Sequence, residues 1–149
     1  MTSPDQLERN KALVIRSLTE IYNAGNVDAA PEVFAADFVG WDPTFPGGAL
    51  HGPEGIRGNV ERGHVSFENW RFDIEDVIAE GDRVVTRVVM RGRSKERFLG
   101  MEPTGKEVEV SGITIHRIAD GKIVERWGNW NTIGMLQQLG RLPPLDQIG

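Results

Sequence analysis

The strongest indication of the fold of this chain is the stretch VEVSGITIHRIADGKIVERWGNWN, residues 108–131. Within it, Asp120-Gly121 stands between two apolar runs, which is a strong signal for a tight β-hairpin turn. We therefore expect antiparallel strands over residues 108–118 and 123–131. Because side chains alternate between the two faces of a strand, one choice of phase determines which residues of both strands face inward.

Outward from this hairpin, further strands are expected on its N-terminal side. Residues 70–75 alternate between apolar and charged side chains, which is typical of a half-buried strand. The turn Glu80-Gly81-Asp82 predicts another hairpin, with its second strand over residues 83–93. A shorter strand is expected at Phe38–Trp41, before a loop rich in proline and glycine.

The N-terminal part of the chain has a helical pattern. Ser3-Pro4-Asp5-Gln6 is a capping box at the start of a helix that we expect to end at Asn23-Ala-Gly25. A short second helix is expected to end at Phe34, and a third to begin at Gly52-Pro53-Glu54. A last short helix is expected over residues 132–139.

The order of these elements predicts an α+β fold. Helices gathered on one face of an antiparallel sheet define that class. A strongly curved, cone-shaped sheet with helices across its mouth would enclose a central pocket. We expect one domain over residues 1–149, with a C-terminal tail from about residue 141.

Composition excludes several classes of function. The chain has 149 residues, a net charge of -5 and no cysteine. The acidic balance argues against a nucleic-acid partner or an anionic membrane, and the lack of cysteine excludes disulfides, thiolate metal sites and a cysteine nucleophile. The three histidines are not at metal-ligand spacing. No apolar run could span a membrane and no secretory signal is present, so we expect a cytoplasmic protein.

One of the two phases of the C-terminal strands gives an apolar inward face with a few polar groups, the composition of a small-molecule pocket. Its members are Thr86, Val88, Met90, Val110, Gly112, Thr114, His116, Val124, Arg126, Gly128 and Trp130. We favour this phase. The opposite phase would aim Glu125, Asn129 and Asn131 inward. In the favoured phase Ile113 and Trp127 face outward, which suggests that a second subunit covers the outer face.

Several separated segments carry a family resemblance. They are Asn23-Ala-Gly-Asn-Val-Asp28, Phe34-Ala-Ala-Asp-Phe-Val-Gly-Trp-Asp-Pro43, Pro103-Thr-Gly105, Val110-Ser-Gly-Ile113, Asp120-Gly-Lys-Ile-Val-Glu-Arg-Trp-Gly128 and Met135-Leu-Gln-Gln-Leu-Gly140. In this order they resemble the SnoaL-like polyketide cyclases and ester cyclases, over about residues 11–140. The resemblance implies the cone fold of ketosteroid isomerase and limonene epoxide hydrolase, a homodimer, no metal or redox cofactor, and a hydrophobic small-molecule substrate.

Asp42 is the first catalytic candidate. It follows the first strand in Trp41-Asp42-Pro43, at the mouth of the expected pocket. The similar Asp-Pro segment of ketosteroid isomerase supplies the carboxylate that abstracts a proton. An apolar pocket disfavours the charged form of a carboxylate, which makes it a stronger base. The structural alternative is that Asp42 caps the proline-rich turn.

Thr114 and His116 are candidate donors to a substrate oxygen, since both fall on the inward face of one strand. The alternatives are an ordinary β-branched strand residue and a histidine satisfied within the fold. Arg126 could bind an enolate or carboxylate oxygen, and Trp130 could stack on a flat ligand. The remaining residues expected to bind substrate are Trp41, Val88, Met90, Gly112 and Gly128.

Gly128 departs from the family pattern. Aldol-type cyclases that this chain resembles carry an acid/base Asp directly after the Trp, where this chain has Trp127-Gly128-Asn129. The predicted function is a cofactor-independent enzyme that uses enolate chemistry on a polyketide-like or aromatic carbonyl compound, most simply a cyclase. The alternatives are a cofactor-free hydroxylase, isomerase or epoxide hydrolase on the same fold, or a non-catalytic dimer that binds a small molecule.

Overall fold

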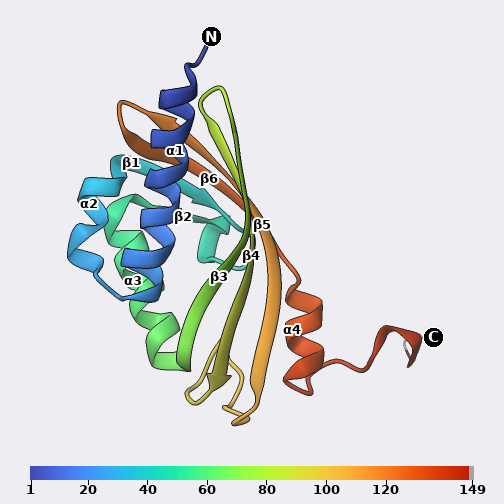
Figure 1. Ribbon diagram of the computed structural model, residues 1–149. Coiled ribbons are helices and arrows are strands. Elements are labelled where there is room, and N and C mark those ends of the chain that lie inside the picture. Colours follow the sequence, from blue (N-terminus) through green and yellow to red (C-terminus); the bar gives the residue numbers. More distant parts are fainter. Residues whose placement is uncertain (148–149) are drawn as a thin grey trace.

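The computed structural model describes residues 1–147 and consists of one curved sheet with helices packed on it (Figure 1). The helices are α1 (Pro4–Arg16), the π-helix η1 (Ser17–Asn23), the 3-10 helix η2 (Val27–Ala29), α2 (Ala30–Val33), the 3-10 helix η3 (Pro46–Gly48), α3 (Gly52–Ser66), α4 (Thr132–Gln138) and the 3-10 helix η4 (Leu145–Gln147). The strands are β1 (Phe34–Trp41), β2 (Ala49–His51), β3 (Phe67–Glu80), β4 (Arg83–Ser94), β5 (Glu107–Ala119) and β6 (Lys122–Trp130). No helix in this part of the chain is long and apolar enough to cross a membrane.

The six strands form a single sheet in the order β2-β1-β6-β5-β4-β3. Neighbouring strands are antiparallel except for β1 and β6, which are parallel. The helices α1, α2 and α3 lie along the same side of the curved sheet (Figure 1). The predicted α+β class is therefore confirmed, and the core lies between these helices and the sheet.

The hairpin at residues 108–131 has the predicted geometry. Asp120 and Gly121 have φ values of 51° and 74°, as a type I′ turn requires, and the turn joins β5 to β6 through the Ala119–Lys122 pair. Ser3 also caps α1 as predicted, since its hydroxyl accepts a hydrogen bond of 3.1 Å from the Gln6 amide. Residues 141–147 follow α4, and the rest of the expected tail, residues 148–149, lies outside the described residues.

The phase favoured from the sequence is the one in the structure, with one correction. Thr86 pairs with Thr114 and Thr114 with Gly128, so these inward residues form a row across three strands. Val124, by contrast, was expected inward, but Ile123 is the residue that is fully buried. A β-bulge shifts the register between Arg117 and Ile118, which moves Ile123 to the inner face and leaves Val124 half-buried.

Two features of β1 and β2 differ from expectation. β1 begins at Phe34 rather than Phe38, and β2 lies within a segment that we expected to be loop. The register of β1 on β6 is irregular between Phe34 and Val39, and β2 has only three residues. Neither segment is long or regular enough to show the alternation that predicts a strand.

Candidate active site

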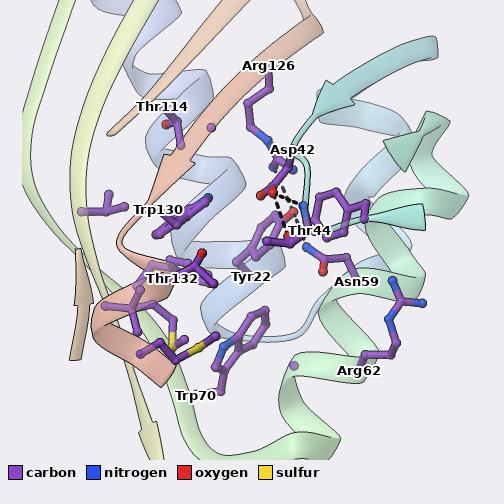
Figure 2. A pocket seen from close by; sticks show the side chains of 18 of the residues that line it. Tyr22, Asp42, Thr44, Asn59, Arg62, Trp70, Thr114, Arg126, Trp130 and Thr132 are labelled. Atoms are coloured by element: carbon purple, nitrogen blue, oxygen red, sulfur yellow. Dashed lines mark hydrogen bonds between the residues drawn. The ribbon is translucent and has the colours of Figure 1, made fainter. Parts of the chain in front are cut away.

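A cavity of about 480 Å³ lies between the helices and the inner face of the sheet. Four of its polar lining residues, Asp42, Arg126, Tyr22 and Asn59, lie close together, whereas Trp70 lies away from this group (Figure 2). The cavity is therefore amphipathic, with a polar part suited to chemistry and an aromatic part suited to binding a flat apolar group.

Asp42 directly follows β1 and is 8% exposed. Its Oδ1 accepts two hydrogen bonds from Thr44, one from the backbone amide at 2.8 Å and one from the hydroxyl at 2.7 Å. Oδ2 makes no hydrogen bond within residues 1–147, and it is not sealed from solvent. Asp42 thus caps its turn through one oxygen and presents the other to the cavity that it lines.

Tyr22 joins two other polar residues of the cavity. Its hydroxyl oxygen accepts a hydrogen bond of 3.1 Å from Asn59 on α3 and one of 2.9 Å from Arg126 on β6. Tyr22 lies on the π-helix η1, whose last residue, Asn23, exchanges two hydrogen bonds with the backbone of Phe72. Sequence periodicity cannot place Tyr22, because a π-helix changes which side chains of the last turn face the sheet.

His116 is the most thoroughly buried of the candidates, at 2% exposed. Its pKa is lowered to about 3, mainly by burial and also by the positive charge of Arg126, whereas an interaction with the Val84 backbone opposes both. The ring is therefore neutral at pH 7. Its Nδ1 is buried and has no hydrogen-bond partner. Nε2 is not a buried atom of this kind. A neutral ring can still donate one N–H to a ligand.

Thr114 lies next to His116 on the inner face of β5, and it lines the cavity. Its hydroxyl shares a hydrogen bond of 2.5 Å with the hydroxyl of Thr86, in which either oxygen can be the donor. When Thr86 donates, the Thr114 proton is free for a ligand. The predicted donor pair is thus brought together on one wall.

Most of the expected binding residues also line the cavity: Trp41, Val88, Met90, Arg126, Gly128 and Trp130. Gly112 does not line it, because the indole of Trp130 packs directly over it and occupies the place of a side chain. Trp41 is 46% exposed and lies at the rim, where its Nε1 donates to Glu125 at 3.4 Å.

Several residues that line the cavity were not predicted from the sequence. They are Ser17, Leu18, Tyr22, Thr44, Phe45, Pro46, Asn59, Arg62, Gly63, Trp70, Phe72, Phe98, Leu99, Thr132 and Met135. Only Asn59 and Arg62 show a signal in hindsight, since they are polar residues three apart on one helix. His64 is engaged in packing, with Nε2 at 2.7 Å from the Tyr22 carbonyl oxygen. In residues 1–147 no group of three acidic, histidine or cysteine side chains could hold a metal ion.

Comparison with known sequences identifies a family and several relatives. The model of the SnoaL-like polyketide cyclase family matches residues 12–139. The aklanonic acid methyl ester cyclase DnrD of Streptomyces peucetius is 28% identical over 141 residues, covering 90% of this chain and 93% of the relative. The nogalonic acid methyl ester cyclase of Streptomyces nogalater is 28% identical over 133 residues, covering 87% and 97%.

Solved structures agree with this fold. A SnoaL-like protein from Jannaschia sp. CCS1 is similar with a TM-score of 0.82 and 25% identity, covering 97% of this chain and 99% of the other. TsrD from Streptomyces laurentii is similar with a TM-score of 0.78 and 23% identity, covering 95% and 100%. The second similarity concerns the fold alone.

Proposed function

This chain belongs to the SnoaL-like polyketide cyclase family, and we propose that it is a cofactor-independent cyclase in which Asp42 is the base. The substrate would be a hydrophobic polyketide-like or aromatic carbonyl compound, as the names of the sequence relatives suggest. The observation that carries the proposal is Asp42 itself, a buried carboxylate with one oxygen held by Thr44 and the other open to the cavity.

The proposed reaction is an intramolecular ring closure. Oδ2 of Asp42 takes a proton from the carbon next to a substrate carbonyl, which leaves an enolate. The enolate carbon attacks a second carbonyl carbon of the same molecule, so that a C–C bond forms and the C=O π bond breaks. The new alkoxide then takes back the proton from Asp42. Substrate and product are isomers, so the reaction consumes no oxidant or reductant.

Thr114 and His116 would stabilise the enolate oxygen as hydrogen-bond donors. Both lie on the wall of the cavity, and His116 is neutral, so it can donate an N–H without having to lose a charge. Donors that are already in place stabilise developing charge strongly in a site that excludes water, and removal of one such donor typically lowers the rate by roughly 10²–10³.

Asp42 is also the acidic residue that the cavity offers. Among residues 1–147 no other Asp or Glu lines it. At Gly128, where the resembling aldol cyclases carry an Asp, there is no side chain to act as a base. A base at the end of β1 therefore supports a cyclase whose acid/base group has a different position from that of those enzymes.

The test is proton exchange at carbon, which needs no knowledge of the natural substrate. An aromatic β-keto ester in D₂O serves as the probe, and NMR follows the loss of its α-proton signal. We expect Asp42→Asn to lower the enzyme-dependent exchange by roughly 10²–10⁴, the usual contribution of a general base. The matched control is Asp37→Asn, which removes an exposed carboxylate from the same strand and should leave exchange unchanged. Near-intact exchange in Asp42→Asn would exclude Asp42 as the base.

One observation favours a second function, a non-catalytic protein that binds a small molecule. Gly128 stands in place of the acidic residue of the aldol cyclases, and the cavity remains well formed around it. In the same NMR experiment, this alternative predicts binding of the probe without any enzyme-dependent exchange.

A further inference from the structure

Arg126 is a positive charge on the wall of the cavity without a carboxylate partner. It is half-buried on β6, and it forms no ion pair within residues 1–147. Asp42 lies nearby, but its Oδ1 is taken by Thr44 rather than by the guanidinium (Figure 2). Most other arginines do pair, and Arg117 on the outer face bonds Glu125 at 2.7 Å.

The guanidinium of Arg126 is held in place, but not all of its N–H groups have hydrogen-bond partners. Nη1 donates to Tyr22 at 2.9 Å, and the guanidinium carbon lies 5.7 Å from the ring centres of both Tyr22 and Phe38. Gly40, its partner on β1, leaves the space for it, because a Cβ there would lie 3.3 Å from Nη2. The remaining donor nitrogens of Arg126 have no hydrogen-bond partner among the described residues, and none is sealed from solvent.

A charged guanidinium that is taken partly out of water is costly unless an anion pairs with it. Arginine cannot lose its proton in a protein, and its fork of N–H groups matches the two oxygens of a carboxylate. The partner that this wall lacks is therefore an anion with two oxygens, supplied by the ligand.

The rest of the cavity indicates what carries that anion. The rings of Phe72 and Trp130 meet edge to face at 5.5 Å, and Trp70 meets Phe72 at 5.0 Å. Met90 and Met135 line the same cavity. Aromatic and thioether side chains of this kind favour a flat apolar ring system.

We propose that the substrate is a flat, hydrophobic compound with a free carboxylate, and that Arg126 selects the acid over its ester. The proposal rests on the proposed function, because it concerns the same cavity. The sequence relatives are named as methyl ester cyclases, and a methyl ester has no negative charge at that group. A preference for the carboxylic acid over its methyl ester is therefore the property in which this chain would differ from these relatives.

The experiment compares the binding of three naphthalene probes by calorimetry, with no turnover required. The probes are 2-naphthoic acid, methyl 2-naphthoate and 2-naphthylmethylammonium. We expect the wild-type protein to bind the acid roughly 10- to 100-fold more tightly than the ester, the usual gain from charge-assisted hydrogen bonds. The cationic probe should bind most weakly. An ester that binds as tightly as the acid, or a failure of the acid to bind at millimolar concentration, overturns the proposal.

Variants assign the preference to Arg126. In Arg126→Met the acid and the ester should bind within about twofold of each other, and Arg126→Lys should keep part of the preference. Arg9→Met is the matched control, because Arg9 is an exposed cation on α1 that does not line the cavity and should leave the ratio unchanged. A preference that survives in Arg126→Met contradicts the assignment. If that variant does not fold, the order of the three probes on the wild-type protein still tests the proposal.

The same assay separates this inference from the proposed function. Asp42→Asn removes a neighbouring negative charge, so the variant should bind the acid at least as tightly as the wild type. Should Asp42→Asn keep its proton exchange, Asp42 is not the base, but the acid preference stands. Should the preference be absent while exchange depends on Asp42, the chemistry stands and the substrate class is wrong.

Discussion

Capping of the turn and the proposed role as base, which are alternatives for Asp42 in the sequence analysis, do not exclude each other in the structure. Asp42 caps the turn after β1 through Oδ1, and its Oδ2 is open to the cavity. The hydrogen bonds from Thr44 hold the carboxylate in one orientation, which a base needs in order to meet its proton at the right distance.

The hydroxyl of Thr44 is therefore expected to position Asp42. Thr44→Val removes the 2.7 Å hydrogen bond from the hydroxyl and keeps the one from the backbone amide. We expect kcat for proton exchange to fall by roughly tenfold with KM little changed, because the effect concerns orientation rather than binding. Thr44→Ser, which restores a hydroxyl, should recover most of the rate. A variant in which only KM rises would point to a role in substrate binding instead.

His116 makes the stability of the fold depend on pH. In an unfolded chain a histidine titrates near 6.5, whereas burial lowers the pKa of His116 to about 3 in the fold. As the pH falls below 6.5, His116 becomes protonated in the unfolded chain but stays neutral in the folded chain. The contribution of neutral His116 to the free energy of unfolding is thus fully present above pH 6.5 and is lost as the pH falls toward 3. Between pH 8 and pH 5 the loss from this group should be about 2 kcal/mol.

Urea unfolding at a series of pH values measures this dependence. In His116→Gln the part of the pH dependence that comes from this residue should vanish. Equal slopes in the two proteins would show that His116 is not buried as a neutral ring.

The candidate residues on the strands could be predicted because a strand has only two faces. Once the phase was chosen, the inward positions of Thr114, His116 and Arg126 followed. Tyr22 could not be predicted in this way, since it depends on a π-helix and on two partners from distant elements, Asn59 and Arg126. Local periodicity carries no information about such contacts.

Among the elements, β5 and β6 make a close contact where Trp130 packs on Gly112. The two residues are paired across the strands, and the indole fills the space beside the glycine. The bare backbone at this position is therefore what allows Trp130 to lie flat against the sheet and to form the wall of the cavity.

Gly112→Ala should displace that indole. The added methyl group would overlap with the ring of Trp130, so we expect a loss of stability of about 1–3 kcal/mol, the usual cost of overpacking. Binding of the naphthalene probes should weaken as well. Chemical unfolding and calorimetry measure the two effects. The control is Ser111→Ala on the exposed neighbouring position, which should change neither.

The long hairpins were predictable from the sequence, whereas the short strand β2 and the β-bulge near Ile118 were not. The hairpins β3–β4 and β5–β6 have turn residues and alternation that act locally. β2 is defined by its pairing with Val39–Trp41, and the bulge between Arg117 and Ile118 is defined by the pairing of β5 with β6. Both depend on the partner strand rather than on the segment itself.

For the whole molecule, the outer face of the sheet carries exposed apolar side chains. Ile113 is 53% exposed there, and Trp127 is half-buried under Arg83, whose guanidinium lies 5.2 Å from the ring. We expect a second copy of the chain to cover this face, as predicted from the sequence. Sedimentation at micromolar concentration should show a dimer, and Ile113→Asp should shift it toward the monomer.

Val65→Asp is the control for that measurement. Val65 is 60% exposed but lies on α3, away from the sheet. The same charge introduced there should leave the sedimentation of the protein unchanged. A monomeric wild-type protein would contradict the prediction outright.

The parallel pairing of β1 with β6 has a consequence for the synthesis of the protein. β1 ends beside Asp42 and is made on the ribosome before β6, which carries Arg126. Until β6 is made, β1 has only the short β2 as a neighbour, so nascent chains expose a bare strand edge that other chains could join. The cavity can therefore be completed only once β6 has been made, and chains that terminate before β6 should be substrates for chaperones rather than enzymes of low activity.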